Sequence, residues 1–212
     1  MEYHPGIRAI KSYIKQGEIG EILYIYSQRL NLGKVRSDEN CLWSLGPHDI
    51  SVILSLIGKE PKSVVATGQS YLQKEIEDVV FLTMSFPNKI MANVHISWLD
   101  PHKVRKFTIA GSKKMVVFDD MQSMEKIKVY DKGIGPPNNY RSYGRDLHLR
   151  FGDISIPHIK MSEPLRIECL HFLDCIKNNK TPISSGEEGL KVVKILEAAQ
   201  ESMNREGILV NV

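Results

Sequence analysis

Six segments between Ser63 and Tyr130 decide the fold: SVVATGQSY (63–71), DVVFLTMSF (78–86), IMANVHISW (90–98), KFTIAG (106–111), MVVFD (115–119) and KIKVY (126–130). Each segment is rich in β-branched or aromatic residues, and short polar, Gly, Pro or Asn turns separate them. Pro87-Asn88-Lys89 predicts a hairpin between two of these strands. Because consecutive strands without intervening helices usually pair antiparallel, the sequence predicts a large, mainly antiparallel sheet.

The region before Ser63 predicts a helix, a strand and a second helix. The first helix is expected from Pro5 to Gln16, with an isoleucine stripe on one face and Gly17 after its end. The segment ILYIYSQRL (22–30) is typical of a strand. The second helix contains Ser44 and His48, tolerates Pro47 only near its start, and ends at about Ile57.

The region after Tyr130 predicts a long irregular segment and two more helices. Residues Asp131 to Met161 are polar, with two adjacent prolines, which favours a lid, a binding loop or an oligomer arm. An apolar stripe from Leu165 to Ile176 predicts a helix. Ser184 with Glu187, or Ser185 with Glu188, offers a capping box for a helix to about Asn204, and ILVNV (208–212) predicts a final strand.

These elements together predict one α+β domain over residues 1–212. The expected architecture is a large, mainly antiparallel, open-faced sheet with helices on one face. Because an open apolar face must be covered, we expect a homo-oligomer built through that face of the sheet.

The composition is that of an ordinary soluble domain. The chain has 212 residues, of which 42% are hydrophobic and 25% charged, and a net charge of +3. That charge is too small to indicate nucleic-acid binding. The three cysteines lack metal-ligand spacing, and no apolar run reaches the about 18 residues of a membrane span. With no signal-peptide pattern, we expect a cytoplasmic protein without membrane, nucleic-acid or metal sites.

The stretch RLNLGKVRSDENCLWSLGPHDIS (29–51) carries the candidate chemistry. Ser44 and His48 are four residues apart, so on a helix their side chains share one face. Arg and Lys upstream suit phosphate or carboxylate groups. This arrangement favours proton transfer on an anionic, hydroxyl-bearing substrate. The alternative is that His48 only caps or packs the helix and that the polar loop is an ordinary solvated surface.

Several motifs in order resemble the C-terminal domain of the Gfo/Idh/MocA oxidoreductase family, named after glucose–fructose oxidoreductase and inositol dehydrogenase. They include YHPGIRAIKSYIKQGEIGEI, LWSLGPHDIS, SWLDPHKVRKFTIAGSKKMVVFDD, EPLRIECLHFLDCI and TPISSGEEGLKVVKILEAAQES. The resemblance implies a fold similar to the C-terminal domain of glyceraldehyde-3-phosphate dehydrogenase. Within the family, the chain looks most similar to the branch that acts on UDP-N-acetylglucosamine or its uronic acid at C3.

The resemblance also implies a two-domain enzyme. Family members carry an N-terminal Rossmann domain that binds NAD or NADP and supplies a catalytic lysine in a Glu-Lys-Pro motif. This sequence lacks such a segment, so we expect a truncated form, a split gene product or one half of a two-chain enzyme with a separate Rossmann-domain chain. The cofactor would serve the complete enzyme, and none is expected to bind this chain alone.

In the family, an Asp and a His four residues apart on a helix face the sugar and the nicotinamide. The His position corresponds to His48, but the Asp position is occupied by Ser44, which can hydrogen-bond a hydroxyl but holds no negative charge. Asp49, one residue from His48, points about 100° away around the helix and is a poor substitute. The expected contacts to a sugar or nucleotide-sugar are Arg29, Asn31, Arg36, Asn40 and Arg105.

Two hypotheses follow for this chain. The first is the substrate-binding half of an NAD(P)-dependent sugar or nucleotide-sugar oxidoreductase, with hydride transfer from a sugar carbon and His48 as the base. The helix N-terminus near His48 favours the neutral imidazole. The second is a non-catalytic module that keeps oligomerisation or ligand binding, which the missing cofactor fingerprint and Ser44 favour.

Overall fold

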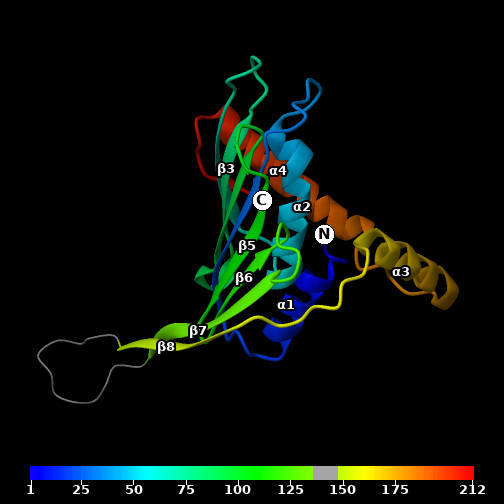
Figure 1. The fold of residues 1–212 in the computed structure, drawn as a ribbon. Coiled ribbons are helices and arrows are strands. Elements are labelled where there is room, and N and C mark those ends of the chain that lie inside the picture. The colour runs from blue at the N-terminus through cyan, green and yellow to red at the C-terminus, as the bar shows by residue number, and fades with distance from the viewer. Residues whose placement is uncertain (136–147) are drawn as a thin grey trace, which may run out of the picture.

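The structure is a computed structural model that describes residues 1–135 and 148–212. Its centre is a nine-stranded sheet with the order β8-β7-β6-β5-β1-β4-β3-β2-β9 (Figure 1). The strands are β1 (Ile22–Leu30), β2 (Ser63–Gln69), β3 (Val79–Ser85), β4 (Met91–Ser97), β5 (Val104–Gly111), β6 (Met115–Asp119), β7 (Ile127–Gly135), β8 (His148–Ser155) and β9 (Val210–Asn211). Strands β1 and β4 pair in parallel, and the other pairs are antiparallel.

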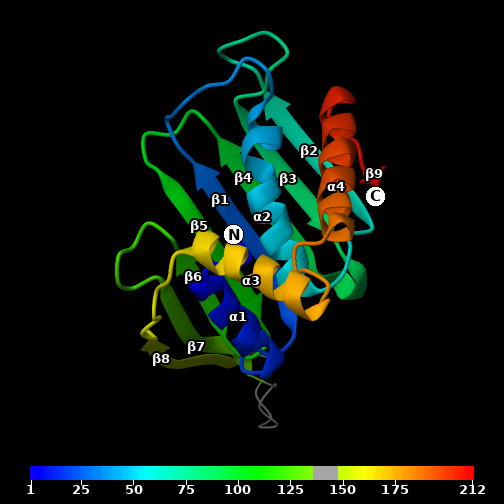
Figure 2. The ribbon, with the colours of Figure 1, turned by 90° about the vertical axis from the view of Figure 1, so that its right-hand side faces the viewer.

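Four helices lie on one side of this sheet: α1 (Pro5–Lys15), α2 (Cys41–Ile57), α3 (Pro164–Asn178) and α4 (Gly186–Asn204). Figure 2 shows them in front of the strands, and Figure 1 shows α3 standing farthest from the sheet. The predicted α+β fold with an open-faced, mostly antiparallel sheet is confirmed. Among the described residues, no helix has both the length and the apolar character needed to cross a membrane.

Most predicted elements and their connections are confirmed. The hairpin between β3 and β4 turns through the short 3₁₀ helix η1 (Pro87–Lys89), where Asn88 has φ 61°. Of the two possible capping boxes, the structure uses the second, because the side chain of Ser185 accepts a hydrogen bond from the Glu188 N–H. The sequence did not indicate that β1 and β4 pair in parallel.

The expected irregular segment from Asp131 to Met161 is wrong where the structure describes strands. Residues up to Gly135 continue β7 and pair with β8. After a register shift between Tyr130 and Lys132, Lys132 lies opposite Phe151 and Ile134 lies opposite Leu149. Ile134, Leu149 and Phe151 are all exposed, so the hairpin forms through backbone pairing without the buried apolar face that marks other strands. Residues 136–147 lie outside the described residues, so for them the expectation stays a prediction.

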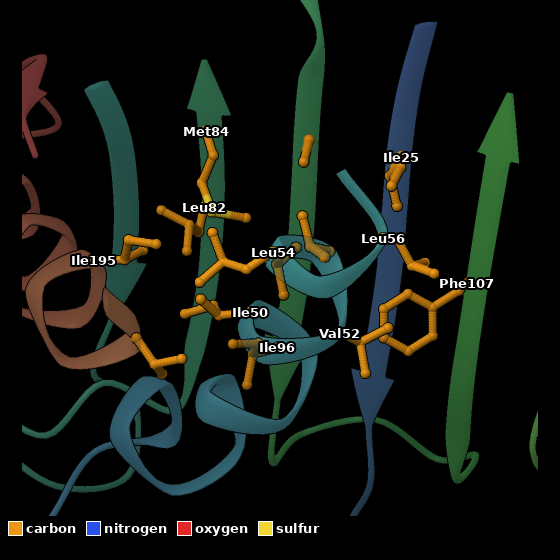
Figure 3. Packing of buried hydrophobic residues seen from close by; sticks show 14 of the residues in the cluster. Ile25, Ile50, Val52, Leu54, Leu56, Leu82, Met84, Ile96, Phe107 and Ile195 are labelled. Atoms are coloured by element: carbon orange, nitrogen blue, oxygen red, sulfur yellow. The ribbon is translucent and has the colours of Figure 1, made fainter. Parts of the chain in front are cut away.

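Helix α2 is the centre of the hydrophobic core. It lies between the sheet, α4 and α1, and its apolar residues therefore point in several directions. Figure 3 shows Ile50 and Leu54 close to Leu82 of β3, while Val52 reaches toward Phe107 of β5. Burial of each such side chain contributes about 1.5–3 kcal/mol. The core thus fixes how α2 is rotated on the sheet.

Two residues of α2 need explanation in this packed position. Gly46 lets the helix approach closely, since an added Cβ would lie 3.1 Å from Leu42 Cδ1 and 3.3 Å from Ile96 Cδ1. Pro47 is the seventh residue of the helix, farther inside than the sequence analysis expects. A proline there removes one helical hydrogen bond, and the packing of α2 on the sheet compensates.

The start of α1 is held by a buried histidine. His4 caps the helix, because its Nδ1 accepts a hydrogen bond from the Gly6 N–H at 3.0 Å. Its Nε2 lies 3.2 Å from Asp120 Oδ1, and the Lys126 ammonium contacts the same oxygen at 3.2 Å. The hydrogen bond from His4, with that from Lys126, outweighs partial burial and holds the pKa of Asp120 well below its usual range.

This contact predicts acid sensitivity. Because the pKa of Asp120 is lower in the folded than in the unfolded chain, its stabilising contribution is complete above the ordinary value of about 3.9. The contribution is lost as the pH falls below that value. As the pH is lowered, we expect the free energy of unfolding to fall less steeply in Asp120→Asn than in the wild type. Urea denaturation at a series of pH values measures this dependence. The exposed Asp153→Asn is the control, and equal slopes in all three proteins would contradict the assignment.

Candidate active site

The helix that carries Ser44 and His48 begins at a capped end. Asn40 is the N-cap of α2, and its side-chain oxygen accepts a hydrogen bond from the Trp43 N–H at 3.1 Å. Its amide nitrogen donates to Gln200 Oε1 at 2.8 Å and to Glu77. Asn40 is buried. Its side chain is therefore engaged within the protein, and the predicted contact with a substrate stays a prediction.

His48 and Asp49 point to opposite environments, as neighbouring helical positions do. His48 is exposed, so its ring is not enclosed by aliphatic neighbours. Asp49 is only 1% exposed and faces the sheet. The helix therefore presents an imidazole outward and a carboxylate inward at the same turn.

Arg29 of β1 is the partner of Asp49. Its Nε and Nη2 donate to Asp49 Oδ1 at 3.0 Å and 2.7 Å. Arg29 lies on the helix-covered face of the sheet with Ile25 and Ser27, as strand alternation requires, and is 4% exposed. Among the buried side-chain atoms that the structure describes, Asp49 Oδ2 has no hydrogen-bond partner. The pair is buried and only partly satisfied.

The charges around this turn favour a neutral imidazole. Partial desolvation lowers the pKa of His48 to about 4, and the positive charges of Arg29 and Arg105 add to the effect. Burial raises the pKa of Asp49, while the Arg29 guanidinium opposes that shift. At neutral pH, His48 is therefore unprotonated and able to accept a proton.

The other predicted site residues divide into two groups. Arg105 of β5 lies directly opposite Arg29 in the strand register, which places it on the same face of the sheet, and Ser44 lies one turn before His48. Asn31 follows β1 and donates its N–H to the Ser97 carbonyl at 3.1 Å. Arg36 is exposed and already pairs with Asp38 and Glu39. The structure thus groups His48, Ser44, Arg29 and Arg105, whereas Arg36 has its own acidic neighbours.

Sequence reasoning missed the role of Asp49. It placed the residue correctly away from His48 but did not connect it with Arg29. Two signals could have found the pair: the alternation Ile25, Ser27, Arg29 on β1, which turns a cation inward, and the position of Asp49 beside the apolar Ile50. A buried cation requires a buried anion nearby.

Taken together, the turn offers a neutral proton acceptor, a hydroxyl and a cation at the surface beside a buried ion pair. Such a group can bind a hydroxyl-bearing anion and remove a proton from it. Within residues 1–135 and 148–212, no three His, Cys, Asp or Glu side chains are placed to hold a metal ion.

A comparison with protein families finds one family along this chain. The model of the GFO/IDH/MocA C-terminal domain matches residues 7–117, just over half of the chain. The match covers most of α1, the whole of α2 and β1 to β5, and it includes Arg29, Ser44, His48 and Arg105. The predicted family is confirmed.

Among curated proteins, the chain is 23% identical over 219 residues to the uncharacterized oxidoreductase YrbE of Bacillus subtilis, covering 95% of this chain and 58% of that protein. Among solved structures, it is similar to the UDP-N-acetylglucosamine 3-dehydrogenase GnnA of Acidithiobacillus ferrooxidans, with a TM-score of 0.74, 21% identity, and 96% and 59% of the two chains covered. It is also similar to a levoglucosan dehydrogenase in complex with NADH, with a TM-score of 0.76, 18% identity, and 98% and 63% covered. The chain therefore spans about three fifths of the length of these relatives.

Removal of one partner of the buried pair is expected to destabilise the fold strongly. Asp49→Ala leaves Arg29 as an uncompensated buried charge, which costs about 3–5 kcal/mol in the free energy of unfolding. Urea denaturation measures this loss. In the control Asp38→Ala, the removed carboxylate belongs to the exposed pair with Arg36, and little change is expected. A loss in Asp49→Ala no larger than in the control would contradict the buried ion pair.

Proposed function

Because the chain belongs to the GFO/IDH/MocA family, we propose that it is the substrate-binding part of an NAD(P)-dependent oxidoreductase that acts on a sugar or nucleotide-sugar. The observation that carries this proposal is the exposed, neutral imidazole of His48 beside the cationic Arg105. The NADH-bound levoglucosan dehydrogenase and the sugar-nucleotide dehydrogenase of similar fold support the substrate class.

In the proposed reaction, His48 accepts the proton of a sugar hydroxyl. Ser44 lies one helical turn earlier and hydrogen-bonds a neighbouring hydroxyl. Arg105 binds a phosphate or carboxylate group of the substrate. A base with a pKa of about 4 is unprotonated throughout the neutral range, so its ability to accept a proton does not require a prior deprotonation step.

We propose that the nicotinamide coenzyme is held mainly by residues outside the part of the chain that the structure describes. That part contains no glycine-rich turn between a strand and a helix of a parallel β-α-β unit, which is what holds a dinucleotide phosphate. We propose that another domain or a separate Rossmann-domain chain presents NAD or NADP to the face that carries His48. A coenzyme held there would supply the acceptor for the hydride of the sugar carbon.

We propose a nucleotide-sugar, with UDP-N-acetylglucosamine as the first candidate. The similar fold of the UDP-N-acetylglucosamine 3-dehydrogenase and the cation at Arg105, which suits a diphosphate or a uronate, support this choice. Titration of the purified chain with UDP-N-acetylglucosamine, glucose and levoglucosan tests it. Heat release and a raised melting temperature with the nucleotide-sugar alone would support it, whereas binding of none of them at millimolar concentration would count against a substrate site.

A second candidate function is a module that binds ligand or oligomerises without catalysis. Ser44 favours it, because a serine replaces the carboxylate that the family usually places one turn before the histidine. The two hypotheses differ in one result. Both allow ligand binding, but only the enzyme hypothesis allows turnover once a coenzyme-binding part is supplied.

Replacement of His48 is expected to abolish most of that turnover. In a fusion with the remaining part of the Acidithiobacillus ferrooxidans enzyme, His48→Gln should lower kcat by about 10²–10⁴-fold, the usual contribution of a general base. Steady-state NAD reduction with the substrate found by titration measures this loss. The control Arg205→Gln removes an exposed cation that pairs with Glu201 just after the end of α4, and it should leave kcat unchanged. Near-normal kcat in His48→Gln would remove this residue from the mechanism.

The open face of the sheet is proposed to form a homo-oligomer. Exposed Tyr24 lies opposite exposed Met91 across the parallel pair, and Phe81 stacks on His95 with ring centroids 4.2 Å apart. Contiguous apolar surface of this kind on a sheet is usually covered in solution. A second copy of the chain can cover this apolar surface with its own sheet face, which gives a symmetric dimer.

This oligomer is tested by charge insertion. We expect the wild type to elute as a dimer or larger species in size-exclusion chromatography with light scattering, and Tyr24→Lys/Phe81→Lys to elute as a monomer. Met124→Lys, in the highly exposed turn between β6 and β7, is the matched control and should not change the mass. A monomeric wild type at high micromolar concentration would contradict the proposal.

A further inference from the structure

A buried ion pair lies directly beneath the turn that presents His48. We propose that Arg29 and Asp49 are positioning residues for His48: their ion pair fixes the second turn of α2 on β1 and thereby holds the imidazole at the surface. The inference rests on the proposed function, in which His48 accepts a proton, but it concerns two residues that are buried beneath His48.

The geometry of the pair argues against a purely stabilising role. Both side chains are more than nine-tenths buried, and a single oxygen of Asp49 receives both hydrogen bonds from Arg29. Asp49 Oδ2 is left without a partner among the described atoms. Apolar residues of similar size usually stabilise such a position as well or better. The charged pair must therefore do something that apolar packing does not. Its hydrogen bonds have a preferred direction, so they can fix Asp49 of α2 against Arg29 of β1.

The local backbone of α2 explains why an anchor is needed at this turn. Pro47 has no N–H, so the helical hydrogen bond to the Trp43 carbonyl is missing immediately before His48. The Ser51 hydroxyl donates to the His48 carbonyl at 3.2 Å, and the ion pair of Asp49 ties the next residue to β1. These side-chain contacts compensate for the missing backbone hydrogen bond at the turn that carries the His48 side chain.

The charges that act on His48 come from two strands and the chain end. They are Arg29 on β1, the amino terminus of Met1, and Arg105 on β5, whereas Asp49 on the same helix points away from the ring. Loss of the Arg29–Asp49 pair would change the electrostatic field and would also free the exposed ring from its partly desolvated position. Loss of Arg105 would change only the field. This difference allows the positioning role to be separated from a simple charge effect.

The test uses the double variant Arg29→Met/Asp49→Leu of the whole chain, which keeps the side-chain volume and leaves no buried charge. NMR follows the pH titration of the His48 ring, assigned by its loss in His48→Gln, and hydrogen exchange of the amides of residues 48–51. In the wild type we expect a midpoint near 4. In the double variant we expect the midpoint to rise by at least one unit toward the ordinary value of about 6.5. The amides should exchange at least tenfold faster.

Two controls complete the experiment. Arg36→Met/Asp38→Leu removes an exposed pair of the same residue types and should change neither readout. Arg105→Gln should raise the midpoint without faster exchange, because the anchor remains. A folded Arg29→Met/Asp49→Leu protein in which either the midpoint or the exchange stays at the wild-type value would overturn the positioning role.

If the double variant does not fold, the variant Arg29→Lys is measured in its place to test the positioning role. Lysine keeps the charge but replaces the two-point guanidinium contact with a single ammonium. The same two changes, smaller in size, support the inference, and wild-type values in both readouts overturn it. All measurements are made without sugar or coenzyme. The positioning role can thus fail while the proposed function stands, and absence of substrate binding would not alter the titration.

Discussion

The apolar contact between α2 and the centre of the sheet is the constraint on which the candidate site depends. The helix packs over β4, β1 and β3, and Ile50, Val52 and Leu54 are buried in that contact. A helix is rigid over a few turns, so once these side chains are buried its rotation is fixed. The outward direction of His48 and the inward direction of Asp49 both follow from that rotation.

The same contact explains why the central strand can carry a charge. Arg29 is near the end of β1, and the next residues leave the sheet for the loop that leads to α2. The guanidinium can remain under the helix only because Asp49 neutralises it there. Burial of Asp49 without Arg29 would favour its protonated form, and burial of the permanently charged Arg29 without Asp49 would destabilise the turn. The pair thus couples the register of β1 to the position of the candidate base.

The sequence predicted the elements whose side chains alternate between a buried and an exposed face. The strand segments 78–86 and 90–98 show this alternation. Helix ends were predicted by a different signal, the residues Pro5, Gly17 and Gly58. The β7–β8 hairpin was missed because Ile134, Leu149 and Phe151 are exposed, so no buried face leaves a pattern. The parallel pairing of β1 with β4 depends on packing of distant elements, which local periodicity does not encode.

For the candidate site, the spacing of Ser44 and His48 was predictable because it is a property of one helix. The contact of Arg29 with Asp49 was not, because it joins two elements 20 residues apart and depends on how α2 lies on β1. Asn40 likewise has a role that the sequence analysis did not assign, because the structure uses it as the N-cap of α2. Its expected contact with substrate stays a prediction.

The identity of residue 44 determines what kind of base His48 can be. A carboxylate one turn before the imidazole would favour the protonated ring and raise its pKa. Ser44 exerts no such attraction, and the neighbouring cations Arg29 and Arg105 act in the opposite direction. The result is an imidazole that is always unprotonated at neutral pH but has a low intrinsic affinity for a proton. In the proposed reaction, proton removal from a sugar hydroxyl would therefore depend on the charge that the substrate carries. An anionic substrate group bound at Arg105, as proposed, would offset that positive charge and raise the pKa of His48, so the strength of the base would depend on whether substrate is bound.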